Sequence, residues 1–158
     1  MQVFDTSSIV YAWDNYPIQQ FPSLWRWMAI RLAEKKICMP EVAIAEIASV
    51  SPECRTWLIE NEINSLPMTD AILQDALRIK NVLQIGVRYG PGVGENDLLI
   101  IATAKTYGVA LVTNEARQPI IPAARTKYKM PAVCSLPEVA VECYDFLEFL
   151  RLSKAIFQ

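Results

Sequence analysis

The chain has 158 residues, of which 53% are hydrophobic, and a formal net charge of −2. This size and apolar content predict one domain over residues 1–158 with a single core. The acidic balance argues against nucleic-acid binding by bulk charge, although it is compatible with a local basic face. No apolar run approaches the roughly 18 residues of a membrane helix, and the first residues lack signal-peptide features, so we expect a cytoplasmic protein without membrane contact.

The sequence contains no histidine, which excludes several catalytic classes. Ser-His-Asp and Cys-His catalysis, histidine-ligated zinc and histidine acid–base ribonuclease chemistry all need this residue. Catalysis must therefore use carboxylates, hydroxyls, lysine or an oxygen-ligated metal. The four cysteines form no C-x-x-C pair, so we interpret them as buried thiols and leave open a disulfide between Cys134 and Cys143.

Short apolar segments alternate with helical patterns along the chain. We expect strands at residues 2–4, 37–39, 64–66, 110–112 and 141–144, with helices starting near residues 9, 24, 40, 52, 69, 97, 135 and 146. The alternation predicts a mostly parallel sheet with helices on both faces. Right-handed crossovers then place the carboxyl ends of all strands at one edge, where ligands bind in open α/β sheets.

Four helix boundaries follow from capping residues. Residues 5–8, Asp-Thr-Ser-Ser, can cap the first helix, and Asn96 or Glu95 can cap the helix that opens with Asp97. Gly108 suits the left-handed end of that helix. Residues 135–138, Ser-Leu-Pro-Glu, fit a capping box and predict a further helix.

Four acidic residues lie at or beside the predicted carboxyl edge. Asp5 and Glu115 follow strands, whereas Glu46 and Asp97 lie on neighbouring helices. Two bare carboxylates about 4 Å apart repel by on the order of 4 kcal/mol, so such a cluster must hold a cation, share protons or stay apart. Mg²⁺ and Mn²⁺ prefer oxygen ligands, and a metal pair can activate water against a phosphodiester. The pattern therefore favours a magnesium or manganese site.

Each acid also has an explanation that involves no function. Asp5 can be a helix cap, Asp97 is favoured by the helix dipole, and Glu115 can be a turn residue. Glu46 is the hardest to explain in this way, because its neighbours in sequence are apolar and burial of an unpaired charge is costly. The joint placement of the four acids favours a functional site.

A basic segment follows Glu115. Residues 116–137 contain no acid and include Arg117, Arg125, Lys127 and Lys129. Arg88 lies in the glycine-rich stretch 86–94, which we interpret as a flexible loop because no Gly-Lys-Ser/Thr ends it. The simplest interpretation of the basic residues is a solvated loop; the functional one is contact with RNA.

Four motifs together resemble the PIN-domain nucleases over almost the whole chain. They are Val-Phe-Asp-Thr-Ser at 3–7, the isolated Glu46, Asn-Asp-Leu-Leu-Ile-Ile-Ala-Thr-Ala at 96–104 and Leu-Val-Thr-Asn-Glu at 111–115. The resemblance implies a parallel sheet in a three-layer α/β/α sandwich. It also implies Mg²⁺- or Mn²⁺-dependent phosphodiester hydrolysis, usually of RNA, and many bacterial members are VapC-type toxins held silent by an antitoxin.

The resemblance also assigns roles to residues. It implies metal ligands at Asp5, Glu46 and Asp97, and Thr113 matches the family's common hydroxyl near the fourth acid. Glu115 departs from the more usual aspartate, so we expect it to assist through water. Further groups are expected to hold the ligands in place without binding the metal: Ser7, Glu95, Thr113 and Asn114.

Two neighbouring tryptophans allow a prediction about partners. Trp25 shares its helical face with apolar residues and is expected in the core, although both rings could also stack on unpaired bases. Trp27 points elsewhere and could contact an antitoxin helix or a second copy in a homodimer.

The leading hypothesis is a metal-dependent endoribonuclease in which the basic segment positions the RNA. Two alternatives of other classes stay open. One is a PIN-like binding or scaffold module without catalysis, and the other is a phosphoacceptor receiver domain, for which the paired acid and a placed lysine are not evident.

Overall fold

The computed structural model describes all residues, 1–158. Its sheet contains β1 (Gln2–Phe4), β2 (Ile37–Pro40), β3 (Asn64–Leu66), β4 (Ala110–Val112) and β5 (Cys143–Tyr144). The helices are α1 (Thr6–Asn15), α2 (Pro22–Ala33), α3 (Glu41–Val50), α4 (Pro52–Glu60), α5 (Asp70–Val82), α6 (Glu95–Tyr107), α7 (Met130–Ser135) and α8 (Phe146–Ser153), with a 3₁₀ turn at Arg125–Lys127. None of these helices combines the length and the apolar character needed to cross a bilayer.

The sheet is entirely parallel and has the order β3-β2-β1-β4-β5. The chain runs outward from β1 to β3 and then returns to the other side of β1, so the connections reverse direction between β1 and β4. Crevices at such a reversal are where α/β sheets bind ligands. The order also differs from the 2-1-3-4-5 arrangement of receiver domains, which removes that alternative.

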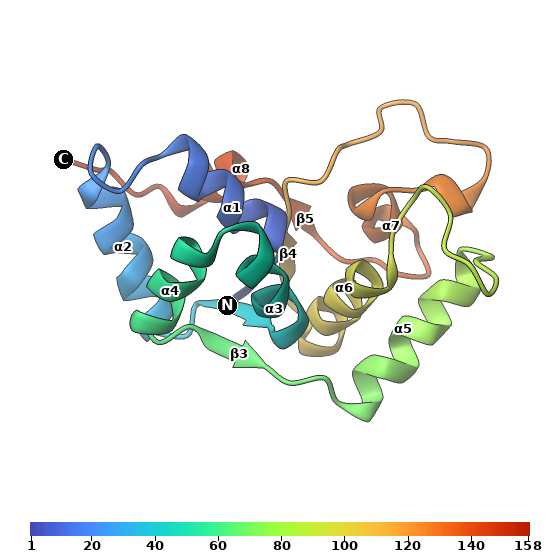
Figure 1. The fold of residues 1–158 in the computed structure, drawn as a ribbon. Coiled ribbons are helices and arrows are strands. Elements are labelled where there is room, and N and C mark those ends of the chain that lie inside the picture. The colour runs from blue at the N-terminus through green and yellow to red at the C-terminus, as the bar shows by residue number, and fades with distance from the viewer.

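Helices cover both faces of the sheet, as the sequence predicts (Figure 1). On one face, α6 contacts β1 and β4 and is flanked by α5 and α7. On the other face, α1, α2 and α4 join through the rings of Trp13, Trp25 and Trp57, and α8 packs its Phe146 and Phe149 on Phe4 of β1. The predicted three-layer α/β/α sandwich is therefore confirmed.

The core is one continuous cluster of 39 buried residues. Trp25 belongs to it, since it is 2% exposed and its indole N–H donates to the Tyr16 carbonyl at 2.6 Å. Trp27 packs within the chain, with ring centroids 5.7 Å from Phe149 and 5.5 Å from Phe157. These contacts leave Trp27 half-buried, and its contact with an antitoxin helix or a second copy stays a prediction.

Two N-terminal boundaries differ from the sequence-based expectation. Helix α1 begins at Thr6 and not near Ile9, because Asp5 alone is the cap and its carboxylate accepts the Ser7 N–H. Helix α6 is capped at Gly94 and not at Glu95 or Asn96. There the Asp97 carboxylate accepts the Gly94 N–H at 2.8 Å, which satisfies a free backbone donor.

The region near Ser135 was predicted wrongly. Ser135 ends α7, and its hydroxyl donates to the Ala132 carbonyl at 2.7 Å within that helix and does not cap a following one. Pro131 in the first turn of α7 was the available signal for this helix. The last strand is shorter than expected, Cys143–Tyr144, whereas the left-handed end of α6 at Gly108, with φ of 65°, is confirmed.

Candidate metal-binding acidic site

The pairing of β1 with β4 places the first predicted acid. Phe4 lies opposite Val112, and the Asp5 N–H donates to the Val112 carbonyl at 2.9 Å. Asp5 and Thr113 therefore leave adjacent parallel strands at the same level. Because these strands flank the reversal in connection order, both side chains lie at the crevice that topology favours for ligands.

Asp5 is held by hydroxyl groups. Ser7 Oγ and Thr113 Oγ1 donate to Asp5 Oδ2 at 2.6 and 2.8 Å, and every side-chain hydrogen bond to Asp5 reaches this one oxygen. Asp5 is 3% exposed, and this burial raises the pKa of its carboxyl, while the hydrogen bonds act in the opposite direction. Oδ1 is the oxygen that these donors leave for another partner.

The segment after β4 connects this network to α8. Asn114 N donates to Ser7 Oγ at 2.9 Å, and Asn114 Oδ1 accepts the Phe146 N–H at 3.0 Å. Ser7, Thr113 and Asn114 thus have the supporting contacts that the sequence suggested. They fix the Asp5 carboxylate between two strands and two helices.

The Glu46 carboxylate has a partner on each oxygen. Thr6 Oγ1 donates to Oε2 at 2.8 Å, and Asn96 Nδ2 donates to Oε1 at 2.6 Å. These bonds explain how a half-buried acid is tolerated on α3, because α3 contacts both α1 and α6. Sequence reasoning missed Thr6 and Asn96, although each stands next to a predicted ligand, Asp5 or Asp97, and that adjacency was the available signal.

Asp97 shows that the acids share one electrostatic environment. Burial raises the pKa of its carboxyl to about 6, partly opposed by the Gly94 N–H bond. The nearby charges of Asp5, Glu115 and Glu46 raise this pKa further. The structure therefore brings all four predicted acids to one edge of the sheet.

Glu115 and Glu95 occupy the margin of this site. The Glu115 N–H donates to Thr113 Oγ1 at 3.1 Å, which fixes its backbone, and its carboxylate adds to the negative charge near Asp97. Glu95 is exposed at the start of α6 and forms no hydrogen bond with the other acids. Asn96 occupies the supporting position that we expected for Glu95.

The donor set suits Mg²⁺ or Mn²⁺ in chemistry, since carboxylate and hydroxyl oxygens line it and the chain has no histidine. The bonds from Ser7 and Thr113 to Asp5, and from Gly94 to Asp97, all go to Oδ2, so none of these donors occupies Oδ1. As the side chains stand, no three acidic or thiol groups are close enough together to hold a metal ion. The residue types therefore fit Mg²⁺ or Mn²⁺. Side-chain rotation would have to bring the carboxylates closer together for them to bind the ion.

Most of the predicted RNA-binding residues are engaged within the chain. Arg117 pairs with Glu148 at 2.6 Å, Arg125 pairs with Glu138 at 3.3 Å, and Lys129 Nζ donates to the Pro91 carbonyl at 3.0 Å. Surface pairs of this kind contribute about 0–1 kcal/mol and exchange readily with a phosphate. The remaining two predicted residues are exposed and carry no such contact: Arg88 and Lys127.

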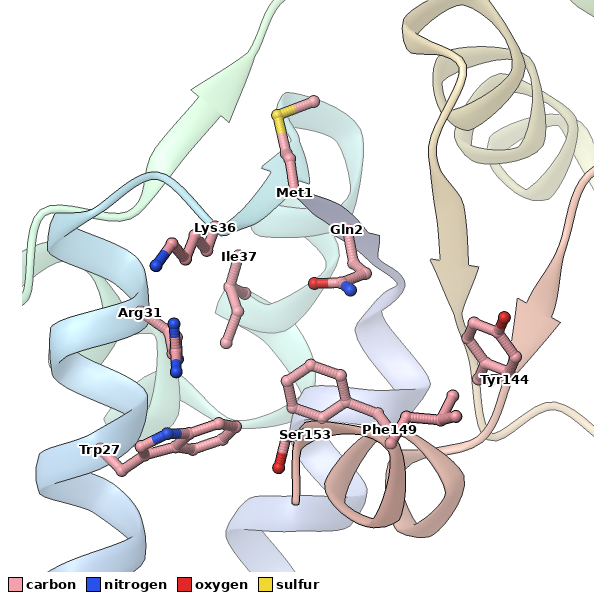
Figure 2. A pocket seen from close by; sticks show the side chains of 10 residues that line it. Met1, Gln2, Trp27, Arg31, Lys36, Ile37, Tyr144, Phe149 and Ser153 are labelled. Atoms are coloured by element: carbon pink, nitrogen blue, oxygen red, sulfur yellow. The ribbon is translucent and has the colours of Figure 1, made fainter. Parts of the chain in front are cut away.

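The best-formed cavity lies elsewhere. It encloses about 280 Å³ under α2 and α8, beside the first residues of β1 and β2, and is lined by Trp27, Arg31, Lys36 and Phe149 among others (Figure 2). None of the four acids lines it. The most enclosed cavity therefore lies at the amino edge of β1 and β2, away from the acids.

Sequence comparison identifies relatives of the chain. The model of the family described as "Domain of unknown function (DUF4411)" matches residues 2–157. A protein named Ribonuclease VapC2 from Haemophilus influenzae is 26% identical over 116 residues, which cover 73% of this chain and 87% of that protein. A Ribonuclease VapC from strain 86-028NP of the same species has the same identity and coverage.

Solved structures resemble the fold at low sequence identity. The DNA-bound VapBC of Salmonella typhimurium superposes with a TM-score of 0.57 at 17% identity, covering 92% of this chain and 97% of that one. PAE2754 from Pyrobaculum aerophilum gives a TM-score of 0.55 at 13% identity, with 98% and 97% covered. FitAcB from Neisseria gonorrhoeae gives 0.53 at 15% identity, with 93% and 99% covered. The chain therefore belongs to the DUF4411 family, and its fold and motifs make it a PIN-domain protein related to the VapC ribonucleases.

Proposed function

We propose that this protein is a metal-dependent endoribonuclease that hydrolyses RNA phosphodiester bonds. The observation that carries the proposal is the convergence of four carboxylates from separate elements: burial raises the pKa of Asp97 to about 6, and the charges of Asp5, Glu115 and Glu46 add to this effect. A fold gains nothing from such repulsion, which lowers its stability. A divalent cation would relieve it, and this makes cation binding the simplest purpose of the arrangement.

Asp5, Glu46 and Asp97 are the proposed ligands of Mg²⁺ or Mn²⁺. A bound cation of this type supplies a nucleophile from water and stabilises negative charge on the phosphate. The Thr113 and Ser7 hydroxyls orient Asp5, and Thr6 and Asn96 orient Glu46, so these donors keep both carboxylates beside the site until a cation draws them together. Glu115 contributes charge at the margin.

The RNA backbone is proposed to cross the acidic site toward the exposed cations. Lys127 and Arg88 are free to meet a phosphate, and Arg117 can exchange Glu148 for one. With so few cations, affinity would depend weakly on salt. The acidic net charge of −2 agrees with a protein that holds RNA locally.

The test is cleavage of a mixed RNA pool by the purified full chain with Mn²⁺ or Mg²⁺. EDTA and the double variant Asp5→Asn/Asp97→Asn should each abolish the fragments. The matched control is Asp70→Asn, which makes the same change at an exposed acid in the first turn of α5. Fragments that persist with EDTA, or in the double variant, would show that the activity is not that of the proposed site.

One observation favours the silent binding module as a second candidate. No three acidic groups stand within metal-binding distance of one another in the structure. If Mn²⁺ fails to raise the melting temperature and no RNA is cut, the silent module is supported. Stabilisation by Mn²⁺ in the native chain that is lost in the double variant would favour the nuclease.

We further infer an antitoxin partner, on the basis of the similarity to chains in structures titled VapBC. Co-expression with the protein encoded beside it should give a complex that elutes as one species and suppresses RNA cleavage. A neighbour that neither co-elutes nor reduces cleavage would remove the antitoxin proposal and leave the nuclease proposal intact.

A further inference from the structure

The four cysteines differ sharply in environment. Cys54 is fully buried, and burial raises the pKa of its thiol to about 12, so it is inert. Cys38 is also fully buried and is occupied by two hydrogen bonds, donating to the Lys35 carbonyl and accepting from Asn64, both at 3.3 Å. The other two thiols, Cys134 and Cys143, lie on elements that contact each other, α7 and β5, and each thiol shifts the pKa of the other.

The fold brings this pair together across two elements. Cys134 lies in α7 and is 1% exposed, whereas Cys143 lies on β5, which is the last strand of the sheet and pairs only with β4. A backbone bond reinforces the contact, because Val141 N donates to the Cys134 carbonyl at 3.1 Å. The packing of α7 on β5 therefore holds Cys134 close to the strand that carries Cys143.

Only Cys143 is open to small molecules. It borders two surface hollows of about 410 and 440 Å³, and Arg117 lines both of them. The neighbouring Cys134 thiol lowers the pKa of the Cys143 thiol, the Arg117 cation adds to this effect, and burial, Glu148 and Asp5 oppose it. An accessible thiol with thiolate character beside a buried partner thiol is the arrangement of a reacting and a resolving cysteine.

We propose that Cys143 and Cys134 are a modification site, at which hydrogen peroxide converts the thiol pair into a reversible disulfide. The Cys143 thiolate attacks one peroxide oxygen, the O–O bond breaks, and hydroxide leaves as a sulfenic acid forms. Cys134 sulfur then attacks Cys143 sulfur, so the S–S bond forms, the S–O bond breaks, and the Cys134 proton leaves with the oxygen as water. Two thiols are oxidised by two electrons, and one peroxide is reduced to two waters.

The disulfide between Cys134 and Cys143 would link α7 covalently to β5, the outer strand of the sheet. The tied strand also supports the acidic site, because the Thr113 N–H donates to the Tyr144 carbonyl at 2.9 Å and Thr113 holds Asp5. Closing the short loop 135–142 restricts the unfolded chain, so we expect the melting temperature to rise by about 5–10 °C on oxidation. Reduction by dithiothreitol should reverse this shift.

The experiment treats the purified full chain with stoichiometric hydrogen peroxide and counts its free thiols. The count should fall from four to two, and mass spectrometry without reduction should find the Cys134 and Cys143 peptides joined, lighter by two hydrogen atoms. Cys143→Ser should prevent the loss of thiols. Cys38→Ser is the matched control and should still form the bond, because Cys38 has other partners.

Three outcomes would overturn the proposal. They are a thiol count that stays at four, oxygen added to Cys143 without a link to Cys134, and a Cys143 bond that joins two chains. If Cys134→Ser folds, its Cys143 should instead accumulate as a sulfenic acid that dimedone traps. If it does not fold, the Cys143→Ser comparison still decides, because Cys143 is only half-buried and serine should be tolerated there.

Discussion

The amino and carboxyl sides of the sheet differ in chemistry. Beside the carboxyl ends of β1 and β4, Asp5 is buried under a network of hydroxyl groups, with three more acids nearby. Beside the amino ends of β1 and β2 lies a cavity of about 280 Å³ with Trp27 and Arg31 on its wall (Figure 2). On the acidic side, repulsion between carboxylates destabilises the fold. On the cavity side, packing of the aromatic rings stabilises it. We therefore expect the functional site at the carboxyl side of the sheet, where the acids lower the stability of the fold.

The largest expected effect is that of Asp97→Asn on catalysis. The amide oxygen can keep the bond from the Gly94 N–H, so the fold should persist while the cation loses a charged ligand. RNA cleavage should fall by at least about 100-fold, or about 2.7 kcal/mol in the barrier. The metal-free variant should melt at a higher temperature than the native chain, since repulsion is removed. Unchanged cleavage with unchanged Mn²⁺ affinity would remove Asp97 from the site.

Trp27→Ala tests the contribution of the cavity at the amino side of the sheet to stability and to cleavage. It deletes the contacts with Phe149 and Phe157 and the cation–π contact with Arg31 at 5.2 Å. Because the ring is half-buried, we expect a loss of about 2 kcal/mol in the free energy of unfolding, measured by urea denaturation. RNA cleavage by the folded variant should stay within about twofold. A selective loss of cleavage without loss of stability would give the cavity side a direct role.

Asn96→Ala separates the support of a ligand from the ligand itself. It removes the 2.6 Å bond to Glu46 Oε1 and leaves the Thr6 bond in place. We expect a roughly tenfold loss in Mn²⁺ affinity, about 1.4 kcal/mol, measured by titration calorimetry. Asn81→Ala, at an exposed position on α5, is the control and should bind Mn²⁺ as the native chain does. Equal affinities for both variants would show that Asn96 does not position Glu46.

The smallest effect is the pH dependence of the metal-free protein. Asp97 has a raised pKa of about 6 in the folded state against 3.8 for an ordinary carboxyl, and the pKa of Asp5 is also raised. Between these values the folded state binds a proton that the unfolded chain does not, so stability rises as the pH falls. From pH 7 to 5 in EDTA we expect a gain on the order of 1 kcal/mol, allowing for partial exposure of Asp97.

The same titration should weaken cation binding. Protonation of Asp97 competes with the metal, so Mn²⁺ affinity should decline below pH 6, in the direction opposite to stability. Denaturation curves at both pH values, run beside Asp97→Asn, provide the measurement. A metal-free chain that is more stable at pH 7 than at pH 5 would show that Asp97 is not held at a raised pKa.

The sequence by itself determined the architecture and predicted that the four acids lie at one edge of the sheet. Short apolar segments that alternate with helical patterns identify the five strands of the parallel sheet, and right-handed crossovers require their carboxyl ends to share an edge. Asp5 and Glu115 were therefore expected at the same edge, and the pairing of β1 with β4 made them neighbours. These conclusions rest on local pattern and chain direction, which the sequence carries.

Only the tertiary structure decided which side chains touch. The bond from Thr6 to Glu46 spans 40 positions and the one from Asn96 spans 50, so no local pattern records them. Phe157 covers Trp27 only because α8 packs where it does on the sheet. Cys134 likewise lies close to Cys143 only because α7 packs on β5. Hydrogen bonds and thiol contacts act over a few ångströms, and separation along the chain does not fix positions to that precision.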